Sequence, residues 1–542
     1  MSPKTTTRTP AMEAGGASRR SSFSSEEGEE LVMRTEGLPE SLDVEDALGN
    51  NLHPEQETLL GRGLSQLNLD EVVKPHGRVE ILGYSMPKIL LYLFSLPPLL
   101  ILLNLILSRL FPLDTYLPRA LLSNGTHPFH PTILLISLDG FRPSYLSSHP
   151  HLLSNILALS TSTHGLRAES MQPIFPSLTF PNHWALMTGL YAESHGIVAN
   201  DFWDPRVFGE GKGGHFMYTD SEKSWHSEWW LGEPIWSVVE REGRKSAVSM
   251  WPGPPVTMAG IAPSYFVPYR KLEPPAKLHQ IFEWLDLPLD DRPEFIASYF
   301  PDIDQSGHKG GPDSAEVNNS LGVIDEMIGG LVAGLEQRNL IGIVDVIIVS
   351  DHGMASTSNE RIIYLDDILG QDGVDAIEHK DGWPSVGLRF KEGVDEDKYL
   401  RMLLDAAEQS NGTFAVYTHD TMPDRWHFSH GHRIAPIYIV PYLGWAISDH
   451  HEHEVIHEGD YRPKGNHGYD NIFPEMQAVF FAHGPFAKSL KITSKGFVSV
   501  DPPILESFRN LEIFSLVMRL QGLTNVEPPH NGTIGFWDAQ FQ

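Results

Sequence analysis

The chain has 542 residues, of which 41% are hydrophobic, and its formal net charge at pH 7 is −30. This length allows one large enzyme domain or two ordinary ones, with enough apolar side chains for a core. The acidic balance argues against binding of nucleic-acid polymers, which requires a basic surface, although bound cations can still attract a small phosphate-bearing substrate. The chain has no cysteine, which excludes disulfides, thiolate catalysis and cysteine-ligated metal sites.

The first part of the chain reads as a tail followed by a membrane anchor. Residues 1–72 are rich in Ser, Thr, Glu and Gly and poor in aromatic residues, which predicts a disordered cytosolic tail, and 73–88 form a juxtamembrane segment. The run ILLYLFSLPPLLILLNLIL at 89–107 carries no charge and is close to the roughly 20 residues that a membrane-spanning helix requires. A buried core helix is the alternative. Lys88 and Arg109 bracket the run, which favours a single transmembrane helix.

Four N-x-S/T sequons follow this apolar run, and none precedes it. They lie at Asn124, Asn318, Asn411 and Asn531. Their one-sided placement predicts glycosylation and puts the C-terminal body outside the cytosol, at the cell surface or in a vacuole or secretory compartment. Residues 111–131, with a proline-containing sequence and the first sequon, are predicted to form a short stalk.

From residue 132 the pattern becomes globular, and 132–542 are expected to form one domain. TILLISLDGF begins at Thr132 and reads as a buried strand that ends at an aspartate, and DVIIVSDHGM at 345–354 repeats that design. AVFFAHG at 478–484 is a third such run, and 314–337 reads as a helix. Buried strands that alternate with helices predict an α/β sheet covered on both faces, with ligands at the carboxyl ends of its strands.

Four segments place carboxylates and imidazoles at strand ends or in loops. The candidate ligands are Asp139, Asp304, His308, Asp351, His352 and His467. Each residue alone has a structural alternative, such as a turn-forming aspartate or a solvated histidine. Together they suit zinc or a similar divalent ion, and six ligands with an added hydroxyl are enough for two ions.

Thr179 lies where the polar sequence Pro-Ser-Leu-Thr runs into an apolar stretch that predicts a helix. Two roles are open for its hydroxyl. The hydroxyl either caps the helix or is a catalytic nucleophile. In the second case, contact with a divalent ion would lower the pKa of the hydroxyl and orient it for attack.

The chain resembles the nucleotide pyrophosphatase/phosphodiesterase family of the alkaline phosphatase superfamily, in its single-pass type II membrane form. The matching segments are, in order, LISLDGFRPSYL, FPSLTFPNHWALMTGLYAESHGIVAND, GEPIW, WPG, PDIDQSGH, SDHGM and GNHGYDN. The resemblance covers residues 132 to about 540. It implies an alkaline-phosphatase-like α/β fold, with a mixed, mostly parallel sheet and helices on both faces, and a hydrolase with two divalent metal ions, usually Zn²⁺.

The resemblance also implies a role for individual residues. One metal ion is held by Asp304, His308 and His467. The other is held by Asp139, Asp351, His352 and the oxygen of the nucleophile Thr179. Asn200 contacts a non-bridging phosphate oxygen, and the nucleotide pocket is shaped by Phe180, Trp251 and Tyr269, for which core packing is the alternative.

The expected substrates are nucleoside triphosphates, dinucleotides and sugar nucleotides, cleaved to nucleoside monophosphates. A phospholipid-directed phosphodiesterase on the same scaffold and an inert surface protein are the alternatives, although an inert copy is expected to lose metal ligands and none is missing. Leu178 and Met250 depart from residues common in nucleotide-acting members, which weakens the inference about substrate more than that about catalysis. The His-rich segment 448–461 is expected to be a solvated loop, with an adventitious metal site as the alternative.

Overall fold

The computed structural model describes residues 78–81, 84–87, 121–493, 497–500 and 503–541. The larger of its two units contains Ala120–Gln542 and is called the body below. In the other unit, strands β1 (Arg78–Ile81) and β2 (Tyr84–Pro87) pair as an antiparallel hairpin within the predicted juxtamembrane segment.

No helix among the described residues is both long and apolar enough to cross a bilayer. The predicted tail at 1–72 and the predicted transmembrane helix at 89–107 lie outside the described residues. The anchor therefore stays a prediction from the sequence.

A nine-stranded sheet forms the centre of the body. Its strand order is β11 (Tyr265–Val267), β10 (Ser246–Ser249), β12 (Phe295–Phe300), β5 (Thr132–Leu138), β13 (Val344–Val349), β22 (Phe480–His483), β6 (Gly165–Ala168), β24 (Pro503–Leu505) and β23 (Phe497–Val500). The five strands from β11 to β13 are parallel, β22 is antiparallel to both of its neighbours, and β6 and β24 are parallel. The expected mixed, mostly parallel sheet is confirmed.

Strand β5 lies in the middle of the sheet and is buried on both faces. Ile133 and Leu135 belong to one hydrophobic core, whereas Leu134, Ile136 and Leu138 belong to the other. This alternation follows from the two-residue period of a strand, and it explains why TILLISL reads as a continuous apolar run rather than an alternating one.

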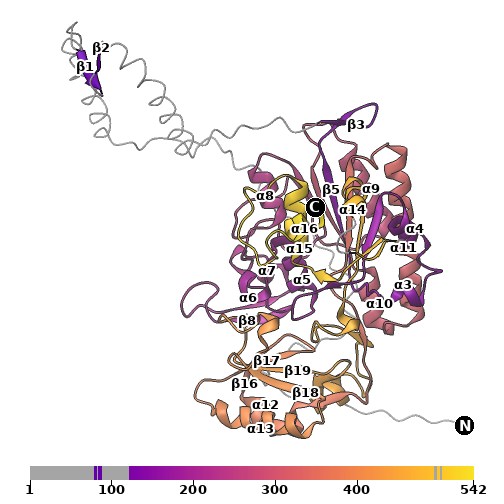
Figure 1. Ribbon diagram of the computed structural model, residues 1–542. Coiled ribbons are helices and arrows are strands. Elements are labelled where there is room, and N and C mark those ends of the chain that lie inside the picture. Colours follow the sequence, from indigo (N-terminus) through magenta and orange to yellow (C-terminus); the bar gives the residue numbers. More distant parts are fainter. Residues whose placement is uncertain (1–77, 82–83, 88–120, 494–496, 501–502, 542) are drawn as a thin grey trace, which may run out of the picture. The chain divides into compact units, whose positions relative to one another are not determined.

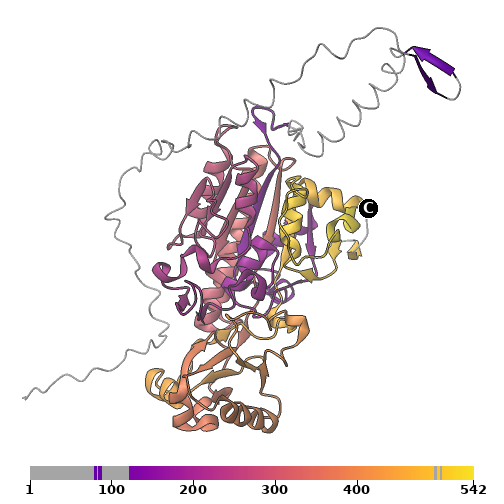
Figure 2. The same ribbon diagram turned by 90° about the vertical axis from the view of Figure 1, so that its left-hand side faces the viewer.

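Helices cover both faces of the sheet, as expected from the sequence (Figures 1 and 2). One core is completed by α4 (Ser154–Thr161), α9 (Pro274–Leu285) and α11 (Ala315–Gln337), to the right of the sheet in Figure 1. The other is completed by α5 (Thr179–Thr188), α8 (Ile235–Arg241), α14 (Pro485–Thr493) and α15 (Glu512–Leu520). The helix expected at 314–337 is α11, whose N-cap Ser314 accepts a hydrogen bond from the Val317 N–H.

A smaller antiparallel sheet, which the sequence analysis did not predict, lies between the β13 and His467 segments of the chain. Residues 365–441 form this small lobe, at the bottom of Figures 1 and 2. Its strands have the order β16 (Ile377–Asp381), β17 (Val386–Phe390), β19 (Ile437–Pro441) and β18 (Phe414–Thr418), and its helices are α12 (Leu365–Ala376) and α13 (Glu396–Gln409). These elements share a third hydrophobic core.

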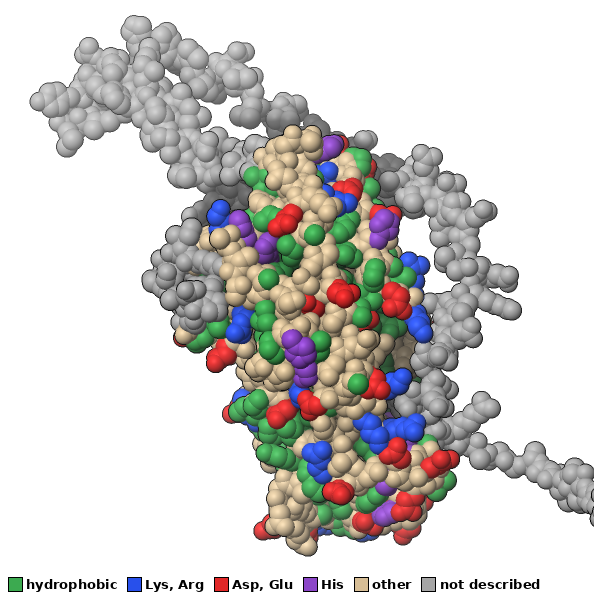
Figure 3. Space-filling view, turned by 90° about the vertical axis from the view of Figure 1, so that its right-hand side faces the viewer, with side chains coloured by type: hydrophobic (Ala, Val, Ile, Leu, Met, Phe, Trp, Pro, Cys, Tyr) green, Lys and Arg blue, Asp and Glu red, His purple; other side chains and the backbone are tan. Residues whose placement is uncertain are grey.

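The described part of the predicted stalk, residues 121–131, packs against the rest of the body. Phe129 is buried, with the Arg292 guanidinium 3.6 Å from the centre of its ring, and the Asn124 side chain donates to the Arg338 carbonyl. On the face drawn in Figure 3, acidic and basic side chains are interspersed, so the negative charge of the chain is not gathered into one patch there.

We expect Leu135→Ala to lower the free energy of unfolding by about 2–5 kcal/mol, because Leu135 is fully buried in the central strand and its removal leaves a cavity. Denaturant unfolding of the body measures this. Leu404→Ala, on the exposed side of α13, is the matched control and is expected to change the value by less than about 0.5 kcal/mol. Equal losses for both variants would contradict the central placement of β5.

Candidate functional site

The first half of the candidate site lies at the carboxyl ends of β5 and β13. These strands are parallel neighbours, and their register pairs Ser137 with Val349. Two residues further on, Asp139 therefore lies beside Asp351, and the Gly140 N–H donates to the Asp351 Oδ1 at 3.3 Å. His352 follows at once, with its Nε2 3.0 Å from Asp351 Oδ2 and 3.4 Å from Asp139 Oδ1.

The second half comes from helix α10 (Asp302–Gly310) and from the residue after strand β21 (Gly465–Asn466). The sequence analysis placed Asp304 and His308 in a loop, and this was wrong, because Asp302 and Asp304 favour the N-terminal turn of a helix. The i, i+4 spacing of Asp304 and His308 puts both side chains on one face of the helix, with His308 Nε2 3.4 Å from Asp304 Oδ2.

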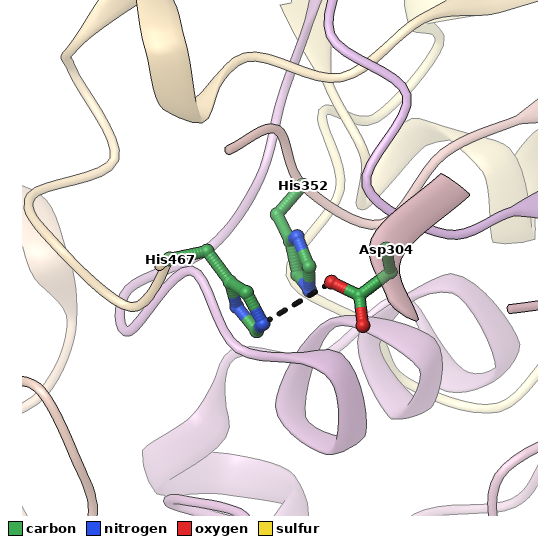
Figure 4. A group of neighbouring side chains, drawn as sticks. All are labelled: Asp304, His352 and His467. Carbon is green, nitrogen blue, oxygen red and sulfur yellow. Dashed lines mark ion pairs between the residues drawn. The ribbon is translucent and has the colours of Figure 1, made fainter. Parts of the chain in front are cut away.

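His467 connects the two halves. Its Nε2 lies 3.4 Å from Asp304 Oδ1 and 3.1 Å from His308 Nε2. Its ring stacks on that of His352 with centroids 3.5 Å apart. Figure 4 shows the side chains of His467, His352 and Asp304 converging on one point. The structure thus brings together all six carboxylate and imidazole residues singled out from the sequence.

All three histidines direct Nε2 toward the carboxylates. The Nδ1 atoms lie 2.9 to 3.0 Å from backbone carbonyl oxygens: His352 near Gly353, His308 near Gly465 and His467 near Ser177. An Nδ1–H that donates to a carbonyl fixes the tautomer in which Nε2 has a free lone pair. This is the form in which imidazole ligates a metal ion.

The carboxylates and imidazoles form two groups able to hold a cation. One consists of Asp304, His352 and His467, and the other of Asp139, Asp351 and His352, with ligand atoms within 4.8 Å of one another. In each carboxylate one buried oxygen has no hydrogen-bond partner among the described residues: Asp139 Oδ1, Asp304 Oδ1 and Asp351 Oδ2. Buried anionic oxygens without partners fit two adjacent divalent ions, which would satisfy and neutralise them.

The pKa values of these groups are pushed apart. Burial raises the pKa of Asp139 well above its ordinary value, and the charges of Asp304 and Asp351 raise it further. Burial also raises the pKa of Asp351, but the His352 and His183 imidazoles outweigh this and hold it well below its usual range. Burial and the neighbouring imidazoles keep the pKa of His467 well below its usual value. Such crowding of like charges is typical of a site built around cations.

Thr179 is the first residue of helix α5 and is not its cap. The N-cap is Leu178, and no side chain caps this helix. The Thr179 hydroxyl instead lies 3.1 Å from His352 Nε2, the imidazole shared by both candidate metal groups. Thr179 is 8% exposed. The hydroxyl is therefore held against the candidate metal centre.

Asn200 is anchored beside the start of helix α5. Its Oδ1 accepts a hydrogen bond from the Phe180 N–H at 3.0 Å. Because this contact fixes the oxygen side of the amide, the Nδ2 group is the part left to donate. Phe180 immediately follows Thr179, so the Asn200 side chain is anchored to the backbone beside Thr179.

Aromatic side chains lie near the site to different depths. The Phe180 ring is partly buried and meets the Tyr218 ring edge-on at 5.5 Å between centroids. Tyr269 is 52% exposed, and its hydroxyl accepts from Gln305, the residue after Asp304. Trp251 is 2% exposed.

Several supporting residues were missed from the sequence. The Tyr299 hydroxyl donates to Asp139 Oδ2. His183, on which the Trp251 ring packs, lies with Nδ1 2.8 Å from the Thr179 carbonyl and Nε2 2.8 Å from the Ser137 hydroxyl. The i, i+4 spacing from Thr179 was the available signal for His183, whereas no sequence signal pointed to Tyr218.

The four sequon asparagines differ in their surroundings. Asn411 and Asn531 are exposed. Asn318 lies partly buried on the first turn of α11 with a buried Oδ1, and the Asn124 Nδ2 is engaged with the Arg338 carbonyl. Glycosylation of the four stays a prediction, with Asn411 and Asn531 the most accessible.

The His-rich segment is more structured than a solvated loop. Residues His451–Ile456 form one π-helical turn. His453 is buried, with Nδ1 2.7 Å from the Tyr364 hydroxyl, and His450 pairs with Asp366 at 3.0 Å. The two candidate metal groups found among the described residues both lie at the site above and do not include this segment.

Comparisons with known proteins agree with this geometry. Residues 133–470 match the model of the family "Type I phosphodiesterase / nucleotide pyrophosphatase". The chain is 39% identical over 420 residues to an uncharacterized pyrophosphatase/phosphodiesterase of Schizosaccharomyces pombe, covering 76% of this chain and 80% of the relative. It is 36% identical over 414 residues to human ectonucleotide pyrophosphatase/phosphodiesterase family member 1, but covers only 41% of that protein and 75% of this chain.

A solved structure has the same fold. It is that of murine ectonucleotide pyrophosphatase/phosphodiesterase 5, as an inactive threonine-to-alanine variant in complex with AMP. The TM-score is 0.63 at 30% identity, over 76% of this chain and 99% of the murine one. The α/β fold and the family resemblance expected from the sequence are thereby confirmed. The chain belongs to the type I phosphodiesterase/nucleotide pyrophosphatase family.

Proposed function

We propose that the chain is a metal-dependent nucleotide pyrophosphatase/phosphodiesterase that acts through a phospho-threonine intermediate. It hydrolyses phosphoanhydride and phosphodiester bonds of nucleoside triphosphates, dinucleotides or sugar nucleotides and releases nucleoside monophosphates. The observation that carries the proposal is the Thr179 hydroxyl, held 3.1 Å from an imidazole shared by two candidate cation groups. The names of the relatives, and the AMP complex of the murine one, support nucleotide substrates.

Two divalent ions, proposed to be Zn²⁺, fit the donor set. Asp304 and His467 would hold one together with His308, whose Nε2 lies 3.4 Å from Asp304 Oδ2. The shared His352 would then belong to the other, with Asp139, Asp351 and the Thr179 oxygen. When bound, the ions would lower the pKa of the Thr179 hydroxyl and offset the negative charge that develops on the leaving oxygen. Helix α5 and the backbone contacts of the histidines hold these ligands in place before substrate arrives.

Thr179 supplies the attacking oxygen in the first step. Its Oγ1 loses its proton to solvent water and forms a bond to phosphorus. The bond to the leaving oxygen breaks on the opposite side, the leaving oxygen departs with the bonding electron pair, and the nucleoside stays on phosphorus. Asn200 Nδ2 donates to a non-bridging oxygen, where negative charge is concentrated in the transition state. In the second step water attacks phosphorus, the Thr179 oxygen leaves and regains a proton, and the nucleoside monophosphate is released.

The nucleoside is proposed to lie against Phe180 and Tyr269. Phe180 adjoins the nucleophile, and Tyr269 is half exposed beside α10. Stacking on aromatic rings depends little on base identity, so broad base tolerance follows. Trp251 is proposed to shape the pocket indirectly, by holding His183. Its Nε1 donates to the His183 carbonyl at 3.3 Å, and its ring packs edge-on against the His183 imidazole.

The sequence supports a single-pass anchor at 89–107 with the body on the extracellular or lumenal side. The four sequons after the apolar run carry this part of the proposal. An inert surface protein is disfavoured, because all six ligating side chains are present and brought together.

Removal of divalent ions is expected to abolish hydrolysis of a phosphodiester, and their return is expected to restore it. Without the ions the buried carboxylates are not neutralised and the Thr179 hydroxyl is not activated. Elemental analysis of purified protein should find two ions per chain. His467→Ala and Asp351→Ala should each lower that number, whereas His279→Ala, an exposed histidine on α9, should not. Less than one ion per active chain would rule out the bimetallic site.

Thr179→Ala is expected to lower kcat by about three orders of magnitude or more, because water replaces a nucleophile held in fixed alignment. Metal content should be unchanged, since the six carboxylate and imidazole ligands remain. Thr179→Ser should keep partial activity. Thr188→Ala, which removes a hydroxyl bonded to the Trp184 carbonyl at the other end of α5, is the control. Parental turnover by Thr179→Ala would show that the hydroxyl is not the nucleophile.

Tyr269→Ala is expected to raise KM for nucleotide substrates about tenfold, since one stacking contact contributes roughly 1–3 kcal/mol. A chromogenic phosphodiester without a base should be hydrolysed as before. Tyr442→Ala removes a ring of similar exposure, 55% against 52%, and should change neither substrate. Equal losses on both substrates would make Tyr269 structural. No loss on either would place Tyr269 outside the pocket and favour a lipid substrate.

A further inference from the structure

The strand that follows Asn200 is held along both of its edges. β8 (Asp201–Asp204) pairs antiparallel with β9 (Gly214–Met217), and the Tyr218 N–H after β9 donates to the Asn200 carbonyl at 3.1 Å. The other edge of β8 faces the small lobe, and Figure 1 shows β8 beside the small-lobe sheet. Asn200 thus lies directly before a strand that is held by β9 on one edge and by the small lobe on the other.

Consecutive residues at the end of small-lobe strand β16 hold that second edge. The Gly382 N–H donates to the Asp201 carbonyl at 2.8 Å. Asp381 Oδ1 accepts from the Trp203 N–H, also at 2.8 Å. A backbone donor and a backbone acceptor of β8 are therefore both satisfied by the small lobe, which leaves this edge of the strand little freedom to move.

A buried chain of charged groups reinforces the contact. The Arg389 Nε donates to Asp381 Oδ2 at 3.0 Å, and its NH2 donates to the Arg433 carbonyl at 2.9 Å. The Arg433 Nε donates to Asp204 Oδ2, at the far end of β8, at 2.7 Å. Asp381 and Asp204 are 2% and 0% exposed. Buried ion pairs contribute little net stability, so these contacts are better explained by the geometry that they fix.

We propose that the small lobe sets the position of the Asn200 amide, and that Asp381 is the positioning residue through which it does so. Asp381 fixes Trp203, three residues after Asn200, while Gly382 fixes Asp201. This inference rests on the role proposed above for Asn200 as the donor to the phosphate. The end of small-lobe strand β16 then supports the proposed catalytic site, although none of the six metal-site residues lies in the small lobe.

The expected loss of turnover on removal of the Asp381 carboxylate follows from how a hydrogen-bond donor stabilises a transition state. A donor aimed at developing charge is effective because it needs no reorganisation during the reaction, and a misplacement of about 1 Å costs up to a hundredfold in rate. Loss of the Asp381 carboxylate removes the acceptor of the Trp203 N–H and of the Arg389 Nε together, while the Arg389 NH2 group keeps its backbone acceptors. The Asn200 side chain itself stays present, so we expect a partial loss of turnover rather than a complete one.

A double-mutant cycle in the full chain tests this. Asp381→Ala should lower kcat about tenfold in the parental background and less than about twofold when Asn200→Ala is already present, with KM nearly unchanged. Asp381→Asn retains an acceptor for the Trp203 N–H and should recover most of the turnover. Leu403→Ala, which opens a cavity in the small-lobe core, should destabilise the lobe without changing kcat by more than about twofold.

Equal loss from Asp381→Ala in both backgrounds would overturn the inference while leaving the proposed function intact. Loss of kcat from Leu403→Ala equal to that from Asp381→Ala would also overturn it, because the effect would then be general destabilisation. If Asn200→Ala leaves kcat unchanged, the proposed role of Asn200 fails as well. Should Asp381→Ala not fold, Arg389→Ala, which unanchors Asp381, gives the same cycle, and additivity with Asn200→Ala overturns the inference.

Discussion

The structure depends on three buried carboxylates that face one another. In the part of the chain that the structure describes, Asp139, Asp304 and Asp351 each keep a buried oxygen without a hydrogen-bond partner, and burial with mutual repulsion raises the pKa of Asp139. A protein that placed these groups together without a cation would gain nothing from the arrangement, because burial of a charge without a partner is costly. The neighbouring imidazoles, each with Nε2 turned toward the carboxylates, complete a donor set for divalent ions.

The fold supplies this arrangement by several routes. Parallel strands β5 and β13 bring two of the carboxylates to one sheet edge, helix α10 adds the third, and the chain returns after the small lobe to place His467 over them. The segment that carries Thr179, the proposed nucleophile, is tied to the same centre, since the Ser177 carbonyl two residues earlier accepts a hydrogen bond from His467. The candidate ligands and the Thr179 hydroxyl are thus fixed by shared contacts rather than by separate loops.

Much of the site could be predicted from the sequence, because the residues lie where backbone patterns change. Asp139 and Asp351 end apolar runs that are strands, and the structure places both at the sheet edge as expected. The helical setting of Asp304 and His308 was missed, since a segment with two glycines looks like a loop although acidic residues favour its first turn. The small lobe and Asp381 could not be found, because their importance arises from contacts such as that between Trp203 and Asp381, which are 178 residues apart. Tyr218 could not be found either, because it meets the Phe180 ring only in the folded chain.

The central claim is that a threonine oxygen, and not water, first attacks the phosphorus. The stereochemical course at phosphorus tests it, with a single diastereomer of a sulfur-substituted nucleoside phosphodiester hydrolysed in ¹⁸O-labelled water. Attack by Thr179 followed by attack by water comprises two in-line displacements, each of which inverts phosphorus, so the nucleoside product is expected to show net retention. Net inversion would mean a single displacement by water and would contradict the role of Thr179 as nucleophile.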